Sequence, residues 1–261
     1  MTEATILALG GGGFTTDADA TALEDFVLSL APAREPRVLF LPTAGGDAAE
    51  QIARFNVAFG GLACEPTVLS LFRLAYLRRS LRDIVLSQDI VYVGGGSMRN
   101  LLAIWRVHGL DDLLREAWER GIVLAGLSAG AMCWFEGGVT TSSGWPEPTP
   151  GLGLLPGSLT VHADGEPERR PVYHAAVRSG ALPPGYAADD GVGLLFRGRT
   201  FVRAVSSRPR AMAHRVDVVD GCAVETPILP TYLGSPELQE RPIPTDVREF
   251  RQLRYGTAYS D

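Results

Sequence analysis

Short apolar runs alternate with segments of helical periodicity through the first half of the chain, and this alternation limits the possible folds more than any other feature. Apolar runs typical of strands lie at residues 5–9, 37–41, 67–71, 89–93 and 122–125, and helical spacing recurs at 17–30, 47–59, 99–107 and 111–120. Strands that are apolar throughout are buried on both faces, and strands joined through helices run parallel. The sequence therefore predicts an α/β fold, a three-layer α/β/α sandwich around a mostly parallel central sheet.

The second half of the chain predicts a more β-rich part of the same fold. Residues 137–157 are rich in Gly, Pro, Thr and Ser, which favours a loop with short extended pieces. Short strands are expected at residues 158–161, 192–196, 200–205, 211–218 and 222–225, and a helix at 167–178. We expect one α/β domain over residues 1–230, followed by an extension over 231–261 that packs on the domain or is partly flexible.

Glycine-rich turns follow three of the predicted strands, at residues 10–13, 94–96 and 126–130. Each lies at the carboxyl end of its strand, which is the edge of an open α/β sheet where ligands bind. The first turn reads GGGGF rather than G-x-G-x-x-G, so dinucleotide binding is disfavoured. We therefore expect the functional site at this edge of the sheet.

The third turn, Gly126-Leu127-Ser128-Ala129-Gly130, has the G-x-S-x-G pattern between a strand and a helix-compatible segment. A sharp turn at this place exposes the Ser128 hydroxyl, and the two flanking glycines leave room where side chains would clash. The backbone N–H of Ala129, at a helix N-terminus, can then face a developing oxyanion. The pattern favours Ser128 as a nucleophile over a small-residue turn without chemistry.

The base that would activate Ser128 must be a histidine, because all 24 basic residues of the chain are arginine. The absence of lysine excludes a Ser–Lys dyad and a Schiff-base lysine. Of the four histidines, His108 lies between two helical patterns, at an expected helix end. His174 falls within a helical pattern and His214 in an alternating strand. His162 ends a strand and enters a polar loop, where an α/β sheet presents catalytic side chains, so it is the preferred base and His214 its main rival.

Two neighbouring acids, Asp189 and Asp190, can orient the imidazole. They precede Gly191 in a sequence that is also an ordinary turn. The order Ser128, His162, Asp190 differs from that of α/β-hydrolases, whereas Ser128, Asp190, His214 keeps an α/β-hydrolase possible. The motif leaves both orders open, since triad geometry recurs on unrelated folds.

Five linked segments together resemble the peptidase E family of serine peptidases. These are GGGS at 94–97, the turn GLSAGAMCWFEGG, LGLLPGS before His162, DGEPERRPVYH after it, and LPPGYAADDGVGLLF around Asp190. The resemblance runs from about residue 5 to residue 218. It implies a flavodoxin-like sheet of the class I glutamine amidotransferase type, with serine in place of the amidotransferase cysteine.

The resemblance implies Ser128 as nucleophile, His162 as general base and Asp190 rather than Asp189 as the acid. Gly95 and Gly96 would supply a second oxyanion donor beside Ala129. In the aspartyl dipeptidases of the family the acid resembles a glutamate, so aspartate here shortens the reach to the histidine. Members of the family often have an auxiliary acid shortly after the helix that follows the serine turn. Residues 140–143 of this chain, in that region, contain no acid. The expected chemistry is acyl transfer through an acyl-enzyme, with no cofactor and no metal.

The substrate is the property that the sequence specifies least. The resemblance implies that an arginine after the catalytic histidine holds a substrate Asp carboxylate, and Arg169 and Arg170 lie near that place, although Glu168 can occupy the matching position. A solvated helix face with internal ion pairs explains EPERR equally well. We expect a small peptide substrate, possibly a dipeptide with N-terminal Asp. The alternatives are a cyanophycinase-like hydrolase and a non-catalytic binding protein of the same fold.

Composition limits which binding partners and which cellular location we expect. The net charge of −6 disfavours nucleic acid, and no apolar run approaches the length of a membrane span. The three cysteines, Cys64, Cys133 and Cys222, have neither metal-ligand spacing nor the pattern of a disulfide framework. The N-terminus lacks the basic region of a signal peptide. We expect a cytoplasmic protein, and a homodimer is an open possibility.

Overall fold

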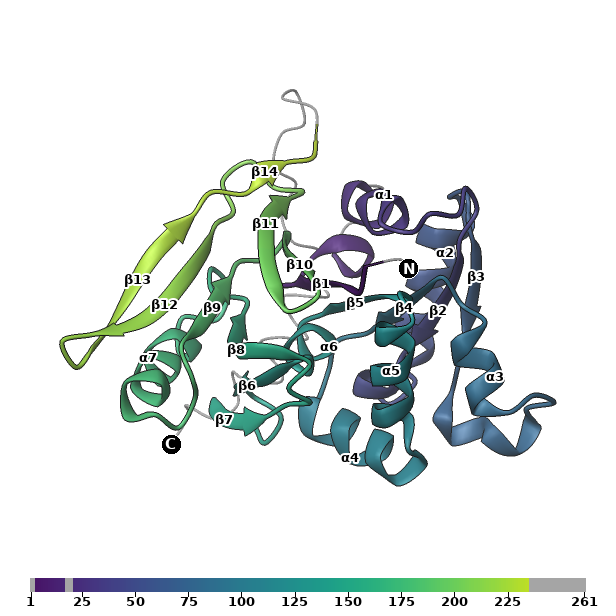
Figure 1. Cartoon of the computed structure of the whole chain (residues 1–261), viewed down its shortest axis with the longest axis horizontal. Coiled ribbons are helices and arrows are strands. Elements are labelled where there is room, and N and C mark those ends of the chain that lie inside the picture. Colours follow the sequence, from purple (N-terminus) through teal and green to yellow (C-terminus); the bar gives the residue numbers. More distant parts are fainter. Residues whose placement is uncertain (1–2, 17–20, 235–261) are drawn as a thin grey trace.

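The computed structural model describes residues 3–16 and 21–234, and over these residues the chain is organised around a sheet of eight strands (Figure 1). The strand order is β14-β11-β10-β1-β5-β4-β2-β3. The strands are β1 (Thr5–Leu9), β2 (Arg37–Leu41), β3 (Glu65–Val68), β4 (Ile90–Val93), β5 (Val123–Leu127), β10 (Val192–Arg197), β11 (Thr200–Ser206) and β14 (Thr231–Tyr232).

Most of the sheet is parallel, as the sequence predicts. Strands β1, β5, β4, β2 and β3 pair in parallel, with β1 and β5 at its centre. Strands β10 and β11 extend it as antiparallel neighbours on the β1 side. The carboxyl ends of β1, β4 and β5 therefore meet at one edge, and the three glycine-rich turns follow these ends.

Alternate residues of the central strands enter two separate apolar cores. In β1, Ile6 and Ala8 belong to one core and Leu7 and Leu9 to the other. All four are fully or almost fully buried, as expected for a parallel strand covered on both faces. This burial explains why the strands read as continuous apolar runs.

Helices cover both faces of the eight-stranded sheet. Helices α1 (Ala22–Ser29) and α2 (Ala49–Gly60) pack on one face, where aromatic side chains such as Phe14, Phe40 and Phe55 stack or meet edge to face. Helices α3 (Leu81–Leu86), α4 (Met98–His108), α5 (Leu110–Glu119) and α6 (Ala129–Met132) lie on the other. Three short 3₁₀ turns, η1 (Gly13–Thr15), η2 (Thr43–Gly45) and η3 (Leu71–Tyr76), occur among the described residues.

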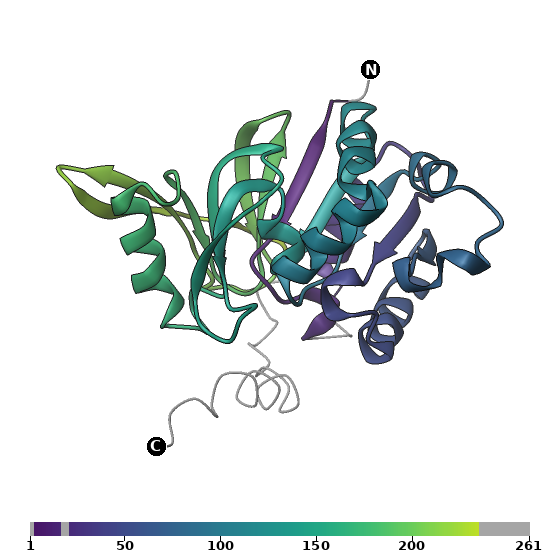
Figure 2. The same ribbon diagram turned by 90° about the horizontal axis from the view of Figure 1, so that it is seen from below.

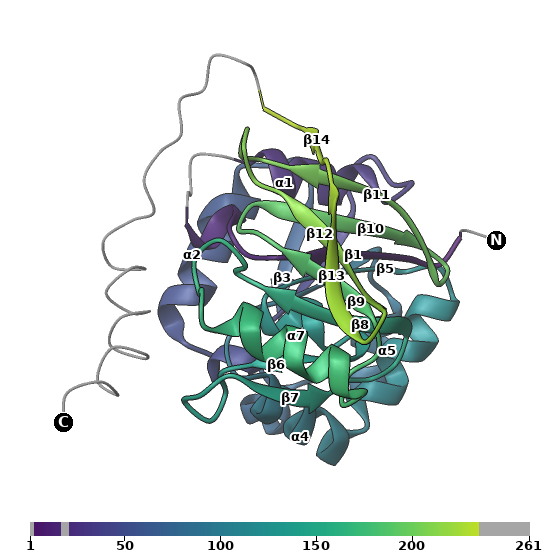
Figure 3. The ribbon, with the colours of Figure 1, turned by 90° about the vertical axis from the view of Figure 1, so that its left-hand side faces the viewer.

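A second sheet of six described strands makes up the β-rich part, in the order β13-β12-β9-β8-β6-β7. Its strands are β6 (Phe135–Thr140), β7 (Glu147–Pro150), β8 (Leu155–Val161), β9 (Gly185–Ala188), β12 (Ala213–Val219) and β13 (Cys222–Ile228). Strands β6, β8 and β9 are parallel and the outer pairs are antiparallel. The β12–β13 hairpin, with its Asp220-Gly221 turn, projects from the side of the molecule that faces the viewer in Figure 3.

The second sheet packs on the same face of the first sheet as α4 and α5. Leu159 and Val161 of β8 share a core with Leu194 and Phe196 of β10. Helix α7 (Arg169–Ser179) covers the opposite face of the second sheet through a smaller core that includes Tyr173. Figure 2 shows the resulting arrangement, with the second sheet and α7 beside the α/β layers. His162, at the end of β8, is thereby brought toward the central strands.

Several predicted elements differ from the observed ones. The helix after Ser128 is only four residues long, because the chain turns at Cys133 into β6. Residues 137–157 hold more strand than expected, and β9 and α3 were not predicted, since their short sequences carry no clear periodicity. The third strand lies at Glu65–Val68 rather than at 67–71, because Leu71 already begins a 3₁₀ turn.

The predicted extension of residues 231–261 is described only to residue 234. Within that piece, β14 pairs in parallel with β11, which adds it to the edge of the large sheet. Asp17, expected to open the first helix, lies outside the described residues. Among the residues that are described, no helix is both long and apolar enough to span a membrane.

Candidate active site

Ser128 occupies a strained turn between β5 and α6. Its φ of 53° and ψ of −114° lie outside the usual regions for an L-residue. A Cβ on Gly126 would come 2.1 Å from the Gly130 carbonyl oxygen, so this turn closes only with glycine at position 126. The Ser128 N–H donates to the Leu9 carbonyl of the neighbouring strand at 3.0 Å, which fixes the turn to β1. The local sequence therefore places the hydroxyl at the carboxyl edge of the sheet, as predicted.

His162 follows the last residue of β8 and also has a positive φ, 55°. Its carbonyl accepts hydrogen bonds from the N–H groups of Gly165 and Glu166, at 3.0 and 2.9 Å, which closes a turn at the strand end. The second sheet, packed on the first, brings the imidazole within hydrogen-bond distance of Ser128. The side chain is mostly buried, with 10% of its surface exposed.

Asp189 and Asp190 follow β9, and they begin a turn in which the Val192 N–H donates to the Asp189 carbonyl at 3.2 Å. Asp190 Oδ1 lies 2.5 Å from His162 Nδ1. Asp189 Oδ2 instead accepts a hydrogen bond from the Met212 N–H at 2.9 Å. Burial raises the pKa of the Asp189 carboxyl, and the nearby Asp164 carboxylate adds to that shift. Of the two acids, the structure brings Asp190 to the imidazole.

The imidazole of His162 bridges Ser128 and Asp190. Its Nε2 lies 2.9 Å from Ser128 Oγ, and its Nδ1 is the atom beside Asp190. A carboxylate only accepts hydrogen bonds, so Nδ1 carries the proton in the neutral ring and Nε2 accepts from the serine hydroxyl. This arrangement can remove a proton from Ser128 and stabilise the resulting imidazolium.

The first glycine-rich turn packs directly against this pair. A Cβ on Gly11 would lie 2.1 Å from Asp190 Oδ1 and 2.6 Å from His162 Cε1. The Gly11 carbonyl accepts a hydrogen bond from the Gly191 N–H at 2.9 Å, which holds the turn against the Asp190 loop. The sequence located this turn at the ligand-binding edge without revealing that its role is close packing on the His–Asp pair.

Of the three predicted oxyanion residues, Ala129 and Gly95 adjoin Ser128, and Gly96 follows Gly95 in the turn after β4. Ala129 is the first residue of α6, so its N–H is among the groups that have no partner within a helix. A Cβ on Gly95 would approach Ser128 Cβ to 3.3 Å, which puts the Gly95 backbone beside the serine. Gly96 has a φ of 144° and leaves no room for a side chain, because a Cβ there would lie 2.1 Å from the Ala44 carbonyl oxygen.

Arg169 and Arg170, predicted to bind substrate, both have carboxylate partners. Arg169 is buried, and it donates to Glu166 Oε2 at 2.5 Å, to the Val139 carbonyl and to Thr141 Oγ1. Arg170 is a third exposed and forms a two-point ion pair with Glu225 of β13. The contacts of Arg169 join the turn after His162 to β6, and those of Arg170 join α7 to the β12–β13 hairpin.

The other histidines lie in elements that agree with the sequence expectations. His108 is the last residue of α4. His214, the rival base, lies in β12, where its Nδ1 is 3.5 Å from an Arg170 nitrogen. His174 lies on α7, with Nε2 2.7 Å from Glu225 Oε1. The hydrogen bonds of His214 and His174 therefore connect them to the α7–hairpin contact.

Cys133 lies close to Ser128 in the sequence but belongs to the apolar core. Cys133 is fully buried five residues after Ser128, and burial raises the pKa of its thiol well above the usual range. It behaves as a small core residue. Over residues 3–16 and 21–234, no group of three or more His, Cys, Asp or Glu side chains is placed to hold a metal ion.

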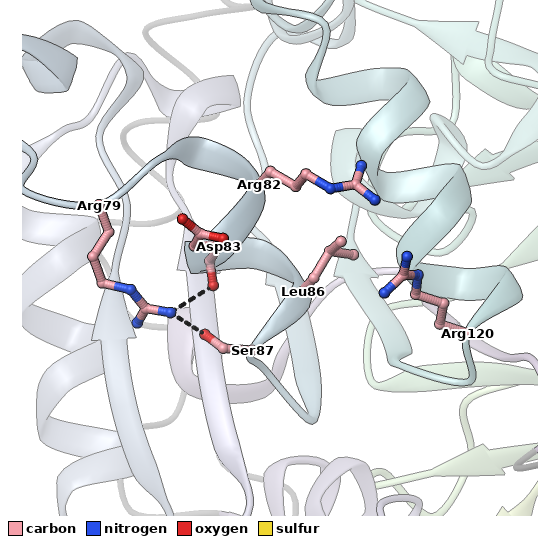
Figure 4. A pocket seen from close by; sticks show the side chains of 6 residues that line it. All are labelled: Arg79, Arg82, Asp83, Leu86, Ser87 and Arg120. Atoms are coloured by element: carbon pink, nitrogen blue, oxygen red, sulfur yellow. Dashed lines mark hydrogen bonds between the residues drawn. The ribbon is translucent and has the colours of Figure 1, made fainter.

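A surface depression with several arginines lies far from this site in the fold. Arg79, Arg82 and Arg120 line it, and Figure 4 shows Arg79 turned toward Asp83 and Ser87. Arg82 and Arg120 both pair with Glu116, at 2.5 and 2.6 Å. Ser87 precedes β4 and Arg120 precedes β5, so the depression lies at the amino ends of the strands, opposite to Ser128.

Two polar residues near Asp190, Asp164 and Arg208, were not predicted from the sequence as part of the site. Asp164 Oδ1 accepts a hydrogen bond from the Asp190 N–H at 2.9 Å, and Arg208 pairs with Asp164 Oδ2 at 3.1 Å. Asp164 was visible as a polar residue in the loop after His162. Arg208 carried no signal, because it lies 44 residues from its partner in an irregular segment after β11.

Comparison with known protein families gives a match that spans most of the chain. The sequence model of peptidase family S51 matches residues 6–204, a range that includes the Ser128 turn, His162 and Asp190. The chain is 46% identical over 229 residues to the uncharacterized peptidase YgaJ of Bacillus subtilis (strain 168). That match covers 88% of this chain and 99% of the relative.

Comparisons of structure support the same fold. A peptidase from an acI-B1 Actinobacterium superposes with a TM-score of 0.64 at 20% identity, over 88% of this chain and 95% of that one. A Listeria monocytogenes EGD-e protein provisionally named a peptidase E superposes with a TM-score of 0.57 at 18% identity, over 78% of this chain and 99% of that one. Both solved structures share the architecture described above.

Proposed function

The chain belongs to peptidase family S51 and is a peptidase, and from this premise we propose that it is a serine peptidase that hydrolyses short peptides. The observation that carries the proposal is the position of the His162 imidazole, 2.9 Å from Ser128 Oγ and 2.5 Å from Asp190 Oδ1. Nucleophile, base and orienting acid at hydrogen-bond distance are the requirement for serine acyl transfer.

In the proposed mechanism His162 Nε2 takes the hydroxyl proton as Ser128 Oγ attacks the scissile carbonyl carbon. Asp190 stabilises the imidazolium that forms. The tetrahedral intermediate then collapses, the C–N bond breaks, and the leaving amine receives the proton from Nε2. Water attacks the acyl-enzyme with the same nitrogen as base, which releases the acid product and restores Ser128.

The tetrahedral oxyanion would be stabilised by backbone N–H groups on either side of Ser128. The N–H of Ala129 at the start of α6 is one donor, and Gly95 and Gly96 in the turn after β4 provide the other. The close approach of Gly95 to Ser128 supports this assignment. Donors held by a strand end and a helix start are rigid, so they need little rearrangement when charge develops.

We further propose specificity for substrates with an N-terminal Asp. One of the two arginines would bind the side-chain carboxylate of that residue. Arg170 suits this role better than Arg169, because its side chain is a third exposed whereas Arg169 is buried against Glu166. The carboxylate of a substrate Asp would then bind Arg170 either together with Glu225 or in its place. Another short-peptide specificity follows if Arg170 stays with Glu225.

Hydrolysis of a dipeptide panel tests these proposals together. We expect turnover of X–Y dipeptides by the full chain, no turnover by Ser128→Ala, and labelling of Ser128 by a serine-directed phosphonate. A preference for Asp–X that disappears in Arg170→Gln but survives in Arg178→Gln, on the same helix, supports the Asp proposal. Cleavage of a β-linked Asp–Arg polymer in place of dipeptides would favour the cyanophycinase-like alternative. No labelling and no hydrolysis would favour a binding protein.

A further inference from the structure

The turn that carries His162 is attached to the Asp190 loop a second time, through Asp164. Asp164 lies two residues after His162, within the turn closed by the His162 carbonyl. Its Oδ1 accepts the hydrogen bond from the Asp190 backbone N–H at 2.9 Å. One turn therefore holds Asp190 at two points, at its carboxylate through His162 and at its peptide nitrogen through Asp164.

The second carboxylate oxygen of Asp164 is held by Arg208. Arg208 Nη1 lies 3.1 Å from Asp164 Oδ2 and 3.5 Å from the Asp190 carbonyl oxygen. The stem of Arg208 lies over Gly191, where a Cβ would come within 2.7 Å of Arg208 Cδ. The Arg208 N–H donates to Ser206 Oγ at 3.0 Å, which fixes the start of the side chain. Asp164 is thus held in one orientation from the segment after β11.

The position of the Asp190 backbone matters because aspartate is short. A single methylene joins its carboxylate to Cα, so rotation of the 189–190 peptide moves the carboxylate relative to the imidazole. Asp190 is 2% exposed, and its N–H has little access to water. Without Asp164 this buried donor loses its acceptor, and the loop must shift to satisfy it.

We propose that Asp164 is a positioning residue for the His162–Asp190 pair, and that Arg208 holds Asp164 in place. The inference rests on the proposed serine-peptidase function. Asp164 acts on catalysis through the backbone of Asp190 and does not touch the substrate. Its loss therefore lowers the rate of the chemical step and leaves substrate binding largely intact.

Three variants of the full chain separate the hydrogen bond from the charge. Asp164→Ala removes both, and Asp164→Asn keeps an oxygen acceptor for the Asp190 N–H. Arg208→Ala removes the ion pair together with the contact of Arg208 to the Asp190 carbonyl, and it leaves the Asp164 acceptor in place. We expect kcat to fall about 10- to 100-fold in Asp164→Ala, with KM within about twofold, because a misplaced catalytic group slows chemistry to this extent. Asp164→Asn is expected to retain kcat within about threefold, and Arg208→Ala to lose about three- to tenfold.

A spectroscopic readout tests the geometry without a substrate. A proton in a short N–H···O hydrogen bond resonates far downfield, so the His162 Nδ1 proton should give such a signal in the wild type. The signal should move upfield or vanish in Asp164→Ala and persist in Asp164→Asn. The matched control is Asp217→Ala, which removes a comparable Asp–Arg pair, with Arg215 at 2.9 Å, on the β12–β13 hairpin. We expect that control to match the wild type in both measurements.

The outcomes distinguish this inference from the proposed function. Wild-type kcat and an unmoved downfield signal in folded Asp164→Ala overturn the positioning role, as does an equal loss in Asp164→Asn and Asp164→Ala. Failure of the wild type to hydrolyse peptides overturns the proposed function instead. The NMR comparison of the two Asp164 variants then still decides whether Asp164 positions Asp190.

Discussion

Ser128 and His162, whose side chains meet at 2.9 Å, both have a positive φ, 53° and 55°. Each follows the end of a strand, β5 in one sheet and β8 in the other. Non-glycine residues in this region cost of order 1–3 kcal/mol and persist only where the surrounding structure holds them. The two halves of the proposed proton transfer are therefore held in strained turns by two separate sheets.

Replacing Ser128 by glycine should remove activity and stabilise the chain. Glycine adopts positive φ without the steric cost of Cβ, so we expect Ser128→Gly to raise the free energy of unfolding by about 1 kcal/mol. Ser128→Ala keeps the Cβ and should unfold close to the wild type. Urea denaturation of the three proteins measures the difference. Equal stability of the glycine and alanine variants would show that the turn is not strained.

Removal of the base or of the acid should in each case strongly reduce hydrolysis. We expect His162→Ala to lower kcat/KM about 10³-fold or more, and Asp190→Asn to lower it by about 10³ to 10⁴, since the amide favours the wrong tautomer of the imidazole. Steady-state kinetics on the best dipeptide of the panel measures both. His214→Ala is the control and should stay within a fewfold of the wild type. The reverse ranking of the two histidines would make His214 the base.

Alanine at Gly11 should disrupt the site from the side of β1. Its Cβ would fall 2.1 Å from Asp190 Oδ1, so the carboxylate or the turn must move, and we expect kcat to drop by about 100-fold. Gly60→Ala, at the end of α2, is the matched control, because a Cβ there meets no atom within 4 Å. Kinetics and thermal unfolding should be measured together. Wild-type kcat in Gly11→Ala would contradict the observed packing.

Glu225 should contribute a pH-dependent part of the stability. Burial alone raises the pKa of its carboxyl, but hydrogen bonds from Arg170 and His174 outweigh burial and lower the pKa from 4.5 to about 2. A carboxyl with a lowered pKa stabilises the fold above pH 4.5, and this contribution is lost as the pH falls toward 2.

We therefore expect Glu225→Gln to reduce the free energy of unfolding by about 1–2 kcal/mol at pH 7, after allowance for solvent screening, and by much less near pH 2. Denaturant unfolding across this pH range gives the comparison. Glu50→Gln, which alters an exposed pair with Arg54 on α2, should change stability little at either pH. A constant difference between wild type and Glu225→Gln at all pH values would exclude the ionic contribution.

Much of the fold was predictable because its signals are local. The apolar run of β5, the glycines around Ser128 and the helical spacing of α4 lie within a few residues of the elements they specify. Strand β9 was missed for the converse reason, and β7 lies in a segment for which only a loop with short extended pieces was predicted. The sequences of β7 (EPTP) and β9 (GYAA) are too short to show a periodic pattern of apolar residues. They become strands only because neighbouring strands supply hydrogen-bond partners.

The sequence by itself determined the parallel α/β plan and the sharp turn at Ser128. Through the absence of lysine, it also determined that any base must be a histidine. From the residues alone both acids stayed open. The tertiary structure brings Asp190 to His162 and pairs Asp189 with the Met212 N–H, because the turn after β9 meets the turn that follows His162. It also decided that Arg170 pairs with Glu225, 55 residues away. Contacts between such distant residues depend on how the sheets pack, and local sequence patterns do not encode that packing.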